Sequence, residues 1–320
     1  MEIVKPEAIR DVYGEMLLEL GALHPDIVVL DADLSGSTRT KKFGDKYPRR
    51  FFNMGVSEMS MVATAAGLAV AGKVPFASTF AIFMAGRALE VVRQSVALPD
   101  ANVKLVASHG GVTVGEDGAS HQMLEDIGNT RMLPNLAVVI PADGNQMRSI
   151  MRAIYAHRGP VYVRMAREPF PQIYPEPPPF QLGHADELRA GTDVTLIGCG
   201  RLVFECLEAA ERLAQTGVSA RVLNLASVKP LDRAAIVRAA KETGAIVTAE
   251  EHFVAGGMGS AVAEVVVEER PVPMRIVGVN DRFGRSGRPA QLMEMFGLTA
   301  ENIVRRAEEV LKLKKSLRES

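Results

Sequence analysis

The sequence predicts an α/β protein with two domains, each built on a doubly wound, mostly parallel sheet. Short runs of Val, Ile, Leu and Ala recur along the chain with helical patterns between them, as expected for strands joined by crossover helices. The runs are apolar at nearly every position, which indicates strands covered on both faces. The 320 residues exceed what one core commonly supports, and a proline-rich segment separates two such series.

The first domain is predicted to span residues 1–168. Its predicted strands are residues 27–30, 74–77, 103–107, 136–140 and 161–163. Between the first two strands, apolar residues follow helical spacing from Met59 to Val70. Ser57 is suited to cap this helix and Gly72 to end it. The helix is rich in Ala and Gly, a composition that permits another helix to pack closely, so we expect it near an interface.

Residues 169–192 are predicted to be a linker, because proline cannot occupy a helix interior or a central strand. The second domain, residues 193–320, repeats the alternating pattern. Its predicted strands are residues 194–197, 220–223, 245–248 and 274–277. Its predicted helices are residues 201–216, 231–243 and 257–268, followed by a charged terminal helix.

Composition narrows the function classes. A formal net charge of −1 gives no electrostatic reason to expect nucleic acid or an anionic membrane as a partner. The two cysteines, Cys199 and Cys206, have the pattern of small core residues. The N-terminus lacks the apolar stretch of a signal peptide, and no run is long enough to span a membrane. We therefore expect a cytoplasmic protein.

The most informative segment is residues 109–121, His-Gly-Gly-Val-Thr-Val-Gly-Glu-Asp-Gly-Ala-Ser-His. It follows a predicted strand, and ligands bind at the carboxyl ends of strands in open α/β sheets. Its glycines permit sharp turns and close approach to a ligand, and imidazole and carboxylate groups suit a polyhydroxylated substrate. A purely structural loop is the alternative. A zinc site would need more ligands than this segment offers.

Two further features of the first domain, a carboxylate and an aromatic pair, each allow both a functional and a structural interpretation. Glu58 falls in the first turn of its helix, where a carboxylate is favoured by the helix dipole whether or not it reacts. Phe80, Phe83 and Arg87 are predicted to share one helical face. The aromatic pair could belong to the core or could stack on a heteroaromatic ring.

The second domain has two motifs of its own. Gly198-Cys199-Gly200 follows a strand, but the third glycine of a dinucleotide fingerprint and the acidic residue of the next strand are missing. We interpret it as a tight strand–helix turn, which argues against an NAD-dependent oxidoreductase. Glu250-Glu251-His252 is predicted to be a solvated or interface corner, with metal binding as the alternative.

Together these motifs resemble the thiamine-diphosphate-dependent transketolases, specifically their pyrimidine-binding and C-terminal domains. The matches occur in order along almost the whole chain. They are Asp31-Ala32-Asp33-Leu34, Gly55-Val56-Ser57-Glu58, Ser78-Thr79-Phe80 with Phe83, His109 through Gln122, Ala166-Arg167, Glu250-Glu251-His252 and Gly256 through Ser260. Each motif alone is weak, whereas their order and spacing together are specific.

The resemblance implies roles in cofactor binding and catalysis. Glu58 would hydrogen-bond the pyrimidine N1′ of thiamine diphosphate and so promote the reactive tautomer. Phe80 and Phe83 match aromatics around the aminopyrimidine, and Asp33 matches a residue near the thiazolium ring. His121 would act with Glu58 as a catalytic residue. The implied reaction transfers a two-carbon ketol unit from a ketose phosphate to an aldose phosphate through a thiamine-diphosphate carbanion.

The resemblance also implies a substrate site for sugar phosphates. His109, Asp117 and His121 match groups that contact sugar hydroxyls. Arg10, Ser37 and Arg167 match a distal phosphate site, where guanidinium groups can bind phosphate in bidentate fashion. The aromatic expected after Phe83 is replaced by Gly86, and Gly110 replaces an acidic residue, so substrate preference is left open.

One departure from the family pattern is larger. The family's Gly-Asp-Gly motif, which holds the diphosphate through Mg²⁺, is absent, and Ala142-Asp143-Gly144 is the nearest approach. The resemblance therefore implies the C-terminal subunit of a split transketolase, with no metal ligands in this chain. A partner N-terminal subunit would supply the Mg²⁺ and diphosphate site, giving an α2β2 heterotetramer, and this chain alone would be inactive.

Three alternatives remain. The chain could be half of a deoxyxylulose-phosphate synthase-like enzyme or the β subunit of a 2-oxo acid dehydrogenase E1. His109, Asp117 and His121 favour sugar-phosphate transfer over 2-oxo acid decarboxylation. A non-catalytic interaction subunit is the third alternative, because a fold does not fix a function.

Overall fold

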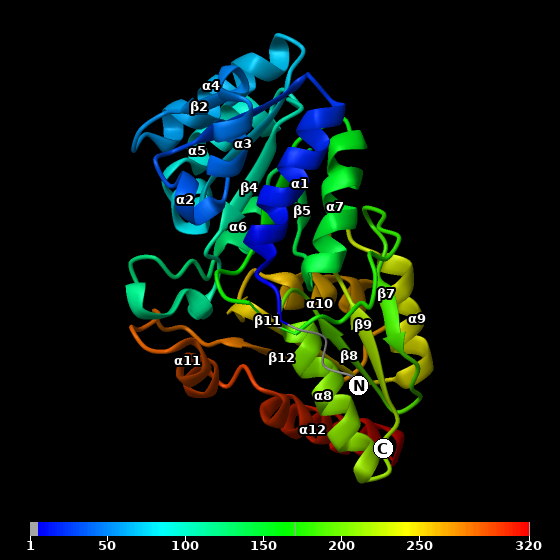
Figure 1. Ribbon diagram of the computed structural model, residues 1–320. Coiled ribbons are helices and arrows are strands. Elements are labelled where there is room, and N and C mark those ends of the chain that lie inside the picture. The colour runs from blue at the N-terminus through cyan, green and yellow to red at the C-terminus, as the bar shows by residue number, and fades with distance from the viewer. Residues whose placement is uncertain (1–5, 170, 320) are drawn as a thin grey trace.

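The computed structural model describes residues 6–169 and 171–319, which form two α/β units (Figure 1). The strands of the first unit are β1 (Ile27–Asp31), β2 (Phe51–Asn53), β3 (Val74–Phe80), β4 (Lys104–Ser108), β5 (Ala137–Val139) and β6 (Val161–Arg164). Its helices are α1 (Ile9–Leu23), α2 (Ser35–Thr38), α3 (Lys41–Lys46), α4 (Glu58–Val70), α5 (Leu89–Val91), α6 (Asp126–Arg131) and α7 (Gly144–Ala156). Two π-helical turns, Phe83–Arg87 and Val92–Ala97, flank α5.

The second unit follows the proline-rich segment. Its strands are β7 (Asp186–Arg189), β8 (Val194–Gly198), β9 (Ala220–Asn224), β10 (Ser227–Lys229), β11 (Ile246–Phe253) and β12 (Met274–Val279). Its helices are α8 (Leu202–Gln215), α9 (Arg233–Thr243), α10 (Met258–Glu269), α11 (Pro289–Phe296) and α12 (Ala300–Glu319). The predicted α/β class with two mostly parallel sheets is confirmed.

The first sheet has the order β10-β5-β6-β4-β3-β1-β2 and the second the order β12-β11-β8-β9-β7. All neighbours pair in parallel except two edge strands, β10 against β5 and β7 against β9. In the first sheet, α1 and α7 lie in contact and cover one face through Tyr13, Leu17 and Ile150. Met61 and Val62 of α4 help to cover the other face. The apolar runs are thus buried from both sides, as their composition predicted.

Three short strands were absent from the prediction. β2 and β10 have three residues each, too few for a hydrophobic period to show. β7 lies within residues 169–192, after the last proline of that segment. β10 belongs to the second half of the sequence but pairs with β5 of the first sheet. One edge strand of the first sheet is therefore supplied by residues that follow the proline-rich segment.

The Glu250-Glu251-His252 motif corrects one prediction, because it forms no solvated corner. The three side chains are buried, with exposed fractions of 0, 3 and 0%, respectively. Glu250 accepts hydrogen bonds from the N–H groups of Met258 and Gly259, both at 2.7 Å, at the start of α10. Glu251 and His252 instead contact the first unit. The motif therefore lies at an interface, which was one of the two predicted environments. A buried carboxylate is tolerated here because backbone N–H groups replace water.

Gly198-Cys199-Gly200 forms the tight turn that the sequence predicted. Gly198 ends β8, Gly200 adopts a φ of 56°, and α8 begins at Leu202. A Cβ on Gly198 would lie 2.9 Å from Cα of Val203, so the close strand–helix approach explains this glycine.

Candidate active site

The loop after β1 is built around the buried carboxylate of Asp31. Its Oδ1 accepts the Leu34 N–H at 2.6 Å, and its Oδ2 accepts the hydroxyls of Thr38 and Thr40 at 2.6 and 2.8 Å. Burial nevertheless raises the pKa of Asp31. This anchor fixes the loop that carries two predicted site residues, Asp33 and Ser37.

Asp33 lies at the carboxyl end of the sheet, exposed to solvent. Its φ of 64° is in the left-handed region, which aspartate tolerates better than most residues. Asn53, the last residue of β2, donates from Nδ2 to Oδ1 of Asp33 at 3.0 Å. The Asn53 Oδ1 in turn accepts the Gly55 N–H at 3.0 Å, which links the ends of β1 and β2 to the segment before α4.

Glu58 is the first residue of α4, as predicted, and is 2% exposed. Its Oε2 lies 3.0 Å from Nη1 of Arg87, whose side chain is 51% exposed. The Arg87 guanidinium also lies over the Phe83 ring, 4.9 Å from its centroid. Ser57 makes no side-chain hydrogen bond to cap the helix. Glu58 therefore meets its charge partner at the edge of an aromatic cluster.

That cluster joins both predicted phenylalanines to both predicted histidines. The Phe80 and Phe83 rings are stacked with centroids 5.9 Å apart and an angle of 11°. His109 stacks on Phe80 at 3.7 Å, and His121 meets Phe83 edge-on at 5.8 Å. Rings from Phe80 to His121, far apart in the sequence, are thus assembled where β3 and β4 end.

The prediction that Phe80, Phe83 and Arg87 share one helical face is wrong. Phe80 is the last residue of β3 and pairs with Ser108 of β4. Only Phe83 and Arg87 lie on a helical turn, and that turn is π-helical. The strand continues further than its apolar run suggested because Ser78 and Thr79 are buried within the sheet.

His109 occupies the most unusual environment of the cluster. It is 2% exposed, has a φ of 61°, and its Nδ1 lies 2.9 Å from the Ser108 hydroxyl. Burial, with contributions from Arg10 and Arg167, lowers the pKa of His109 to about 3. The imidazole is therefore neutral near pH 7 and can both donate and accept a hydrogen bond.

The predicted phosphate residues lie near one another, and both arginines are close enough to lower the pKa of His109. Arg10 donates from Nη1 to the backbone oxygen of Ser37 at 3.2 Å. Burial and the neighbouring Arg39 lower the pKa of Arg10. Arg167 donates from Nη1 to the Val114 oxygen at 2.7 Å. Two guanidinium groups near each other form an environment suited to a dianion.

Residues 112–117 form two short 3-10 turns separated by a kink at Gly115, and Asp117 is exposed at the end of the second. Among the described residues, no polar contact joins Asp117 or Asp33 to the aromatic cluster. The structure therefore brings five of the ten predicted site residues into one cluster, directly or through Arg87: Glu58, Phe80, Phe83, His109 and His121. Arg10 and Arg167 lie close enough to lower the pKa of His109, Ser37 is bonded to Arg10, and Asp33 and Asp117 remain at the periphery.

Sequence reasoning missed the partnership of Arg87 and Glu58 and the anchoring role of Asp31. Arg87 stands 29 positions after Glu58, and no local pattern connects them. The sequence motif that contains Asp31 does not indicate this role. The apolar neighbours of Asp31 in β1 were the available signal, because a carboxylate at the end of a buried strand requires specific donors.

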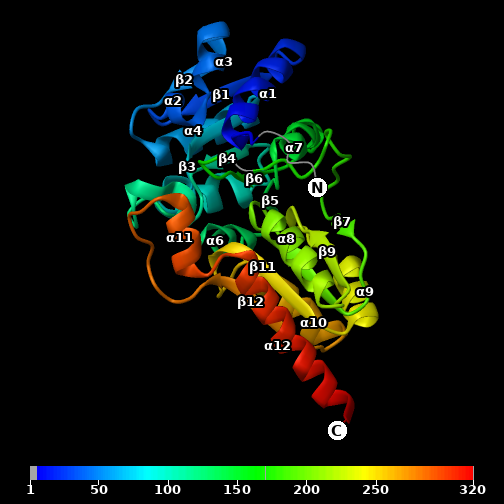
Figure 2. The same ribbon diagram turned by 60° about the horizontal axis from the view of Figure 1, so that its bottom comes forward.

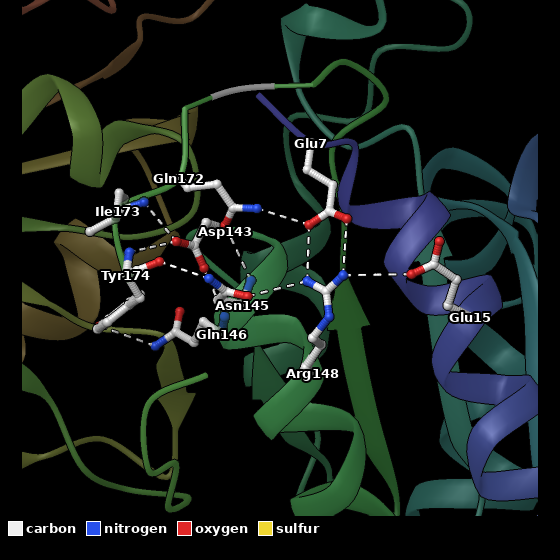
Figure 3. Close-up of polar contacts among 9 residues, drawn as sticks. All are labelled: Glu7, Glu15, Asp143, Asn145, Gln146, Arg148, Gln172, Ile173 and Tyr174. Carbon is white, nitrogen blue, oxygen red and sulfur yellow. Dashed lines mark hydrogen bonds and ion pairs between the residues drawn. The ribbon is translucent and has the colours of Figure 1, made fainter. Parts of the chain in front are cut away.

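Asp143, in the nearest approach to a Gly-Asp-Gly motif, has a structural role (Figure 3). It caps α7 by accepting the Gln146 N–H at 2.7 Å. Its other oxygen accepts the N–H groups of Ile173 and Tyr174, both at 2.7 Å. Within residues 6–169 and 171–319, no group of three or more His, Cys, Asp or Glu is placed to hold a metal ion.

A groove of about 820 Å³ lies beside this cap, between α1 and α7. Three of its charged residues are paired with one another, as Figure 3 shows: Arg148 donates to both oxygens of Glu7 at 2.9 and 3.0 Å and lies 3.5 Å from Glu15. The hydrogen bonds from Arg148 lower the pKa of Glu7. These ion pairs join Glu7 and α1 to α7.

Comparison with known proteins gives a family for this architecture. Residues 5–172 match the family model described as "Transketolase, pyrimidine binding domain", and residues 183–303 match "Transketolase, C-terminal domain". The chain belongs to the transketolase family. Transketolases depend on thiamine diphosphate.

Individual transketolase relatives cover almost the whole chain. A protein of Methanocaldococcus jannaschii named putative transketolase C-terminal section is 46% identical over 96% of this chain and 97% of its own length. A 6-deoxy-6-sulfo-D-fructose transketolase subunit of a Clostridium species is 45% identical, over 96% and 95% of the two chains. A solved structure described as a split gene transketolase, inactive beta4 tetramer, superposes with a TM-score of 0.89 at 47% identity. It covers 97% of this chain and 100% of its own.

No helix among the described residues is long and apolar enough to cross a membrane.

Proposed function

We propose that this chain is the C-terminal subunit of a split transketolase that transfers a two-carbon ketol unit from a ketose phosphate to an aldose phosphate. The observation that carries the proposal is the single cluster formed by Glu58, Phe80, Phe83, His109 and His121. It lies at the carboxyl ends of β3 and β4, where open α/β sheets bind ligands. The family match supplies the chemistry for which such a cluster is suited.

In this proposal Glu58 holds a proton shared with the pyrimidine N1′ of thiamine diphosphate. Its burial keeps water from competing for that proton. Arg87, which engages Oε2 in the isolated chain, has to share or release the carboxylate when the pyrimidine binds. Phe80 and Phe83 would supply apolar surface for the aminopyrimidine ring, and Asp33 is assigned to the surroundings of the thiazolium ring. When bound, the cofactor supplies the carbanion chemistry that breaks and forms the carbon–carbon bond.

The substrate residues follow from the same geometry. His109 is neutral and presents one donor and one acceptor, and His121 lies beside it on the Phe80–Phe83 pair. We assign both, with Asp117, to the sugar hydroxyls, and His121 also to proton transfer during catalysis. Arg10 and Arg167, with Ser37, are assigned to the distal phosphate.

We propose that a partner subunit holds Mg²⁺ and the diphosphate in an α2β2 heterotetramer. Asp143 supports this, because both of its oxygens are committed to backbone N–H groups. The outer face of α4, with Met59 50% and Val70 88% exposed, is the proposed subunit contact. The solved relative described as a split gene transketolase carries the words "inactive beta4 tetramer", which agrees with inactivity in the absence of a partner.

The test is ketol transfer from xylulose 5-phosphate to ribose 5-phosphate, with thiamine diphosphate and Mg²⁺. This chain alone is compared with this chain mixed with a partner that carries the diphosphate-binding domain. Activity only on mixing is expected. Glu58→Ala in the assembled complex should abolish transfer, and unchanged transfer would exclude the assigned role. Turnover by this chain alone would contradict the proposal that the active site is divided between two subunits.

Two relatives define the competing substrates. A 1-deoxy-D-xylulose-5-phosphate synthase of Symbiobacterium thermophilum is 36% identical over 94% of this chain, which corresponds to 46% of its own length. A subunit of the apulose-4-phosphate transketolase of Phocaeicola vulgatus is 38% identical over 95% of this chain. Pyruvate in place of the ketose donor tests the first, and a panel of ketose phosphates tests the second. Consumption of pyruvate would replace ketol transfer by decarboxylative condensation.

A further inference from the structure

The loop that carries His109, Asp117 and His121 is held from outside by the second unit. The carboxylate of Glu251, at the end of β11, accepts the Thr113 N–H through Oε1 at 2.6 Å. The backbone oxygen of Glu251 accepts Nη2 of Arg164 from β6 at 2.8 Å. Both Glu251 and Thr113 are buried, so water cannot replace either contact.

The backbone of the loop is shaped to admit Glu251. Gly111 has a φ of 93°, and a Cβ there would lie 2.3 Å from Cδ of Glu251. A glycine is therefore required at this position on two grounds, backbone conformation and space. The next residue, His252, accepts the Gly128 N–H through Nε2 at 3.2 Å, which fastens the start of α6 to the same strand.

A second contact holds the far end of the loop. Gln122, 4% exposed, donates from Nε2 to the carbonyls of Val112 and Gly115 at 3.1 and 3.2 Å. The same nitrogen donates to the Arg285 carbonyl at 2.8 Å. A Cβ on Gly118 would lie 2.4 Å from the Ser286 hydroxyl, so the segment before α11 rests directly on the loop. Figures 1 and 2 both show α11 beside this loop.

We propose that Glu251 and Gln122 are positioning residues, through which the second unit fixes the substrate loop. Neither side chain is assigned to substrate or cofactor. Each binds backbone atoms of residues 112–115, between His109 and His121, and so sets where the two imidazoles and Asp117 lie. Misplacement of binding groups by about 1 Å is enough to lower catalytic efficiency by two orders of magnitude. This inference rests on the proposed function of the loop.

The structure offers a matched set of variants. Glu251→Ala removes the acceptor for Thr113, whereas Glu251→Gln keeps an oxygen that can accept it. Glu250→Gln is the control, because Glu250 is an equally buried neighbour on β11 that bonds α10 and not the loop. Gln122→Ala provides a second route to the same segment should Glu251→Ala fail to fold.

Amide hydrogen exchange tests the positioning role without depending on catalysis. In the full chain, Glu251→Ala should accelerate exchange in residues 111–118 at least tenfold and leave β4 and β6 unchanged. Glu251→Gln should stay close to the wild type. Glu250→Gln should accelerate exchange at the start of α10 only. Unchanged exchange in residues 111–118 of both Glu251→Ala and Gln122→Ala would overturn the proposal.

Kinetics of the assembled complex provide the functional measurement. Glu251→Ala is expected to raise KM for the ketose phosphate roughly tenfold and to leave thiamine diphosphate affinity within about twofold, because the cofactor residues lie on other elements. Glu251→Gln should restore KM to within about threefold of the wild type. An equal loss of cofactor affinity would contradict a role confined to the substrate loop. Failure of the wild-type complex to transfer ketol units would disprove the proposed function, and hydrogen exchange would still decide whether the loop is held.

Discussion

The buried carboxylate of Glu58 forms an ion pair with Arg87, which is partly exposed to solvent. The side chain of Glu58 is 2% exposed and that of Arg87 is 51% exposed. The buried partner depends on the pair more than the exposed one does. Arg87 can remain hydrated without Glu58, whereas an ionised Glu58 without Arg87 would lack a counter-charge in a site from which water is largely excluded. The same arginine covers the Phe83 ring, so its position also determines how open the proposed pyrimidine site is.

A double-mutant cycle measures this dependence. Arg87→Met, Glu58→Gln and the combined variant should give a coupling free energy of about 1–2 kcal/mol in urea unfolding of the isolated chain. The value is below that of a fully buried pair because Arg87 is partly screened by solvent. The exposed pair of Lys41 and Asp45, with both side chains 64% exposed, serves as the control and should couple by less than about 0.5 kcal/mol. Equal coupling in the two pairs would mean that burial of Glu58 contributes nothing.

His109 predicts a specific pH dependence of stability. Its pKa is about 3 in the folded chain against an ordinary value of 6.5, because burial disfavours the charged form. Between these values the unfolded chain binds the additional proton, so the free energy of unfolding falls as pH falls below 6.5. From pH 7.5 to pH 5 this one residue should remove about 2 kcal/mol.

The measurement compares the wild type with His109→Asn in urea unfolding at pH 7.5 and pH 5. Asparagine does not titrate in this range and tolerates the left-handed φ of 61°. The wild type should lose about 2 kcal/mol more stability than the variant over this range. Identical losses would show that His109 takes up its proton in the folded chain.

Among the secondary-structure elements, α4 combines a buried face with one that is apolar and open. Met61, Val62 and Ala65 are buried, whereas Met59 and Val70 on the opposite side are 50 and 88% exposed. Gly67 lies on the exposed side, and a Cβ there would meet nothing within 4 Å. A glycine in a helix interior with open space around it is unfavourable for the isolated chain, so an assembly that needs close approach would explain it.

Substitution of Gly67 separates folding from assembly. Gly67→Leu should raise the free energy of unfolding of the isolated chain by up to about 1 kcal/mol, because leucine is the better helix former. The same change should weaken association with the partner subunit, measured by sedimentation equilibrium of the mixture, since the added side chain would occupy the proposed interface. Unaltered association would place the subunit contact elsewhere.

The elements that the sequence predicted well are those with a long apolar signal, such as β1, β8 and α10. The site was predicted less completely. His109 and His121 flank one glycine-rich loop and were found from it, but the ion pair between Glu58 and Arg87 depends on tertiary packing. Phe80 was placed on a helix because two polar residues, Ser78 and Thr79, precede it and conceal the continuing strand. A local sequence pattern can indicate which residues are unusual. Their hydrogen-bond and ion-pair partners are brought together only by the tertiary fold.

At the scale of the whole molecule, the two units are tied by more than a linker. β10 adds an antiparallel edge to the first sheet, and Glu251 and His252 reach into the first unit from β11. Arg131 of α6 also donates to the Gly256 carbonyl at 2.6 Å. Backbone pairing and buried polar contacts across the boundary should make the two units unfold together.

The tyrosines make this expectation simple to test. All five lie at or before Tyr174, so tyrosine fluorescence reports on the first unit and the segment that follows it. Circular dichroism at 222 nm reports helices of both units. The two signals should follow one urea transition with the same midpoint. Separate midpoints would show that the second unit unfolds independently.

The position of β10 also affects synthesis of the chain. Translation produces residues from the N-terminus onward, so β5 emerges with an unpaired outer edge and waits for Ser227–Lys229 to be made. An exposed strand edge readily recruits the wrong partner, including the same edge of another nascent chain. Ribosome pausing between β5 and β10 would prolong this interval, and faster translation of that stretch would shorten it. The yield of soluble chain should therefore depend on codon usage between residues 140 and 227 more than on codon usage after β10.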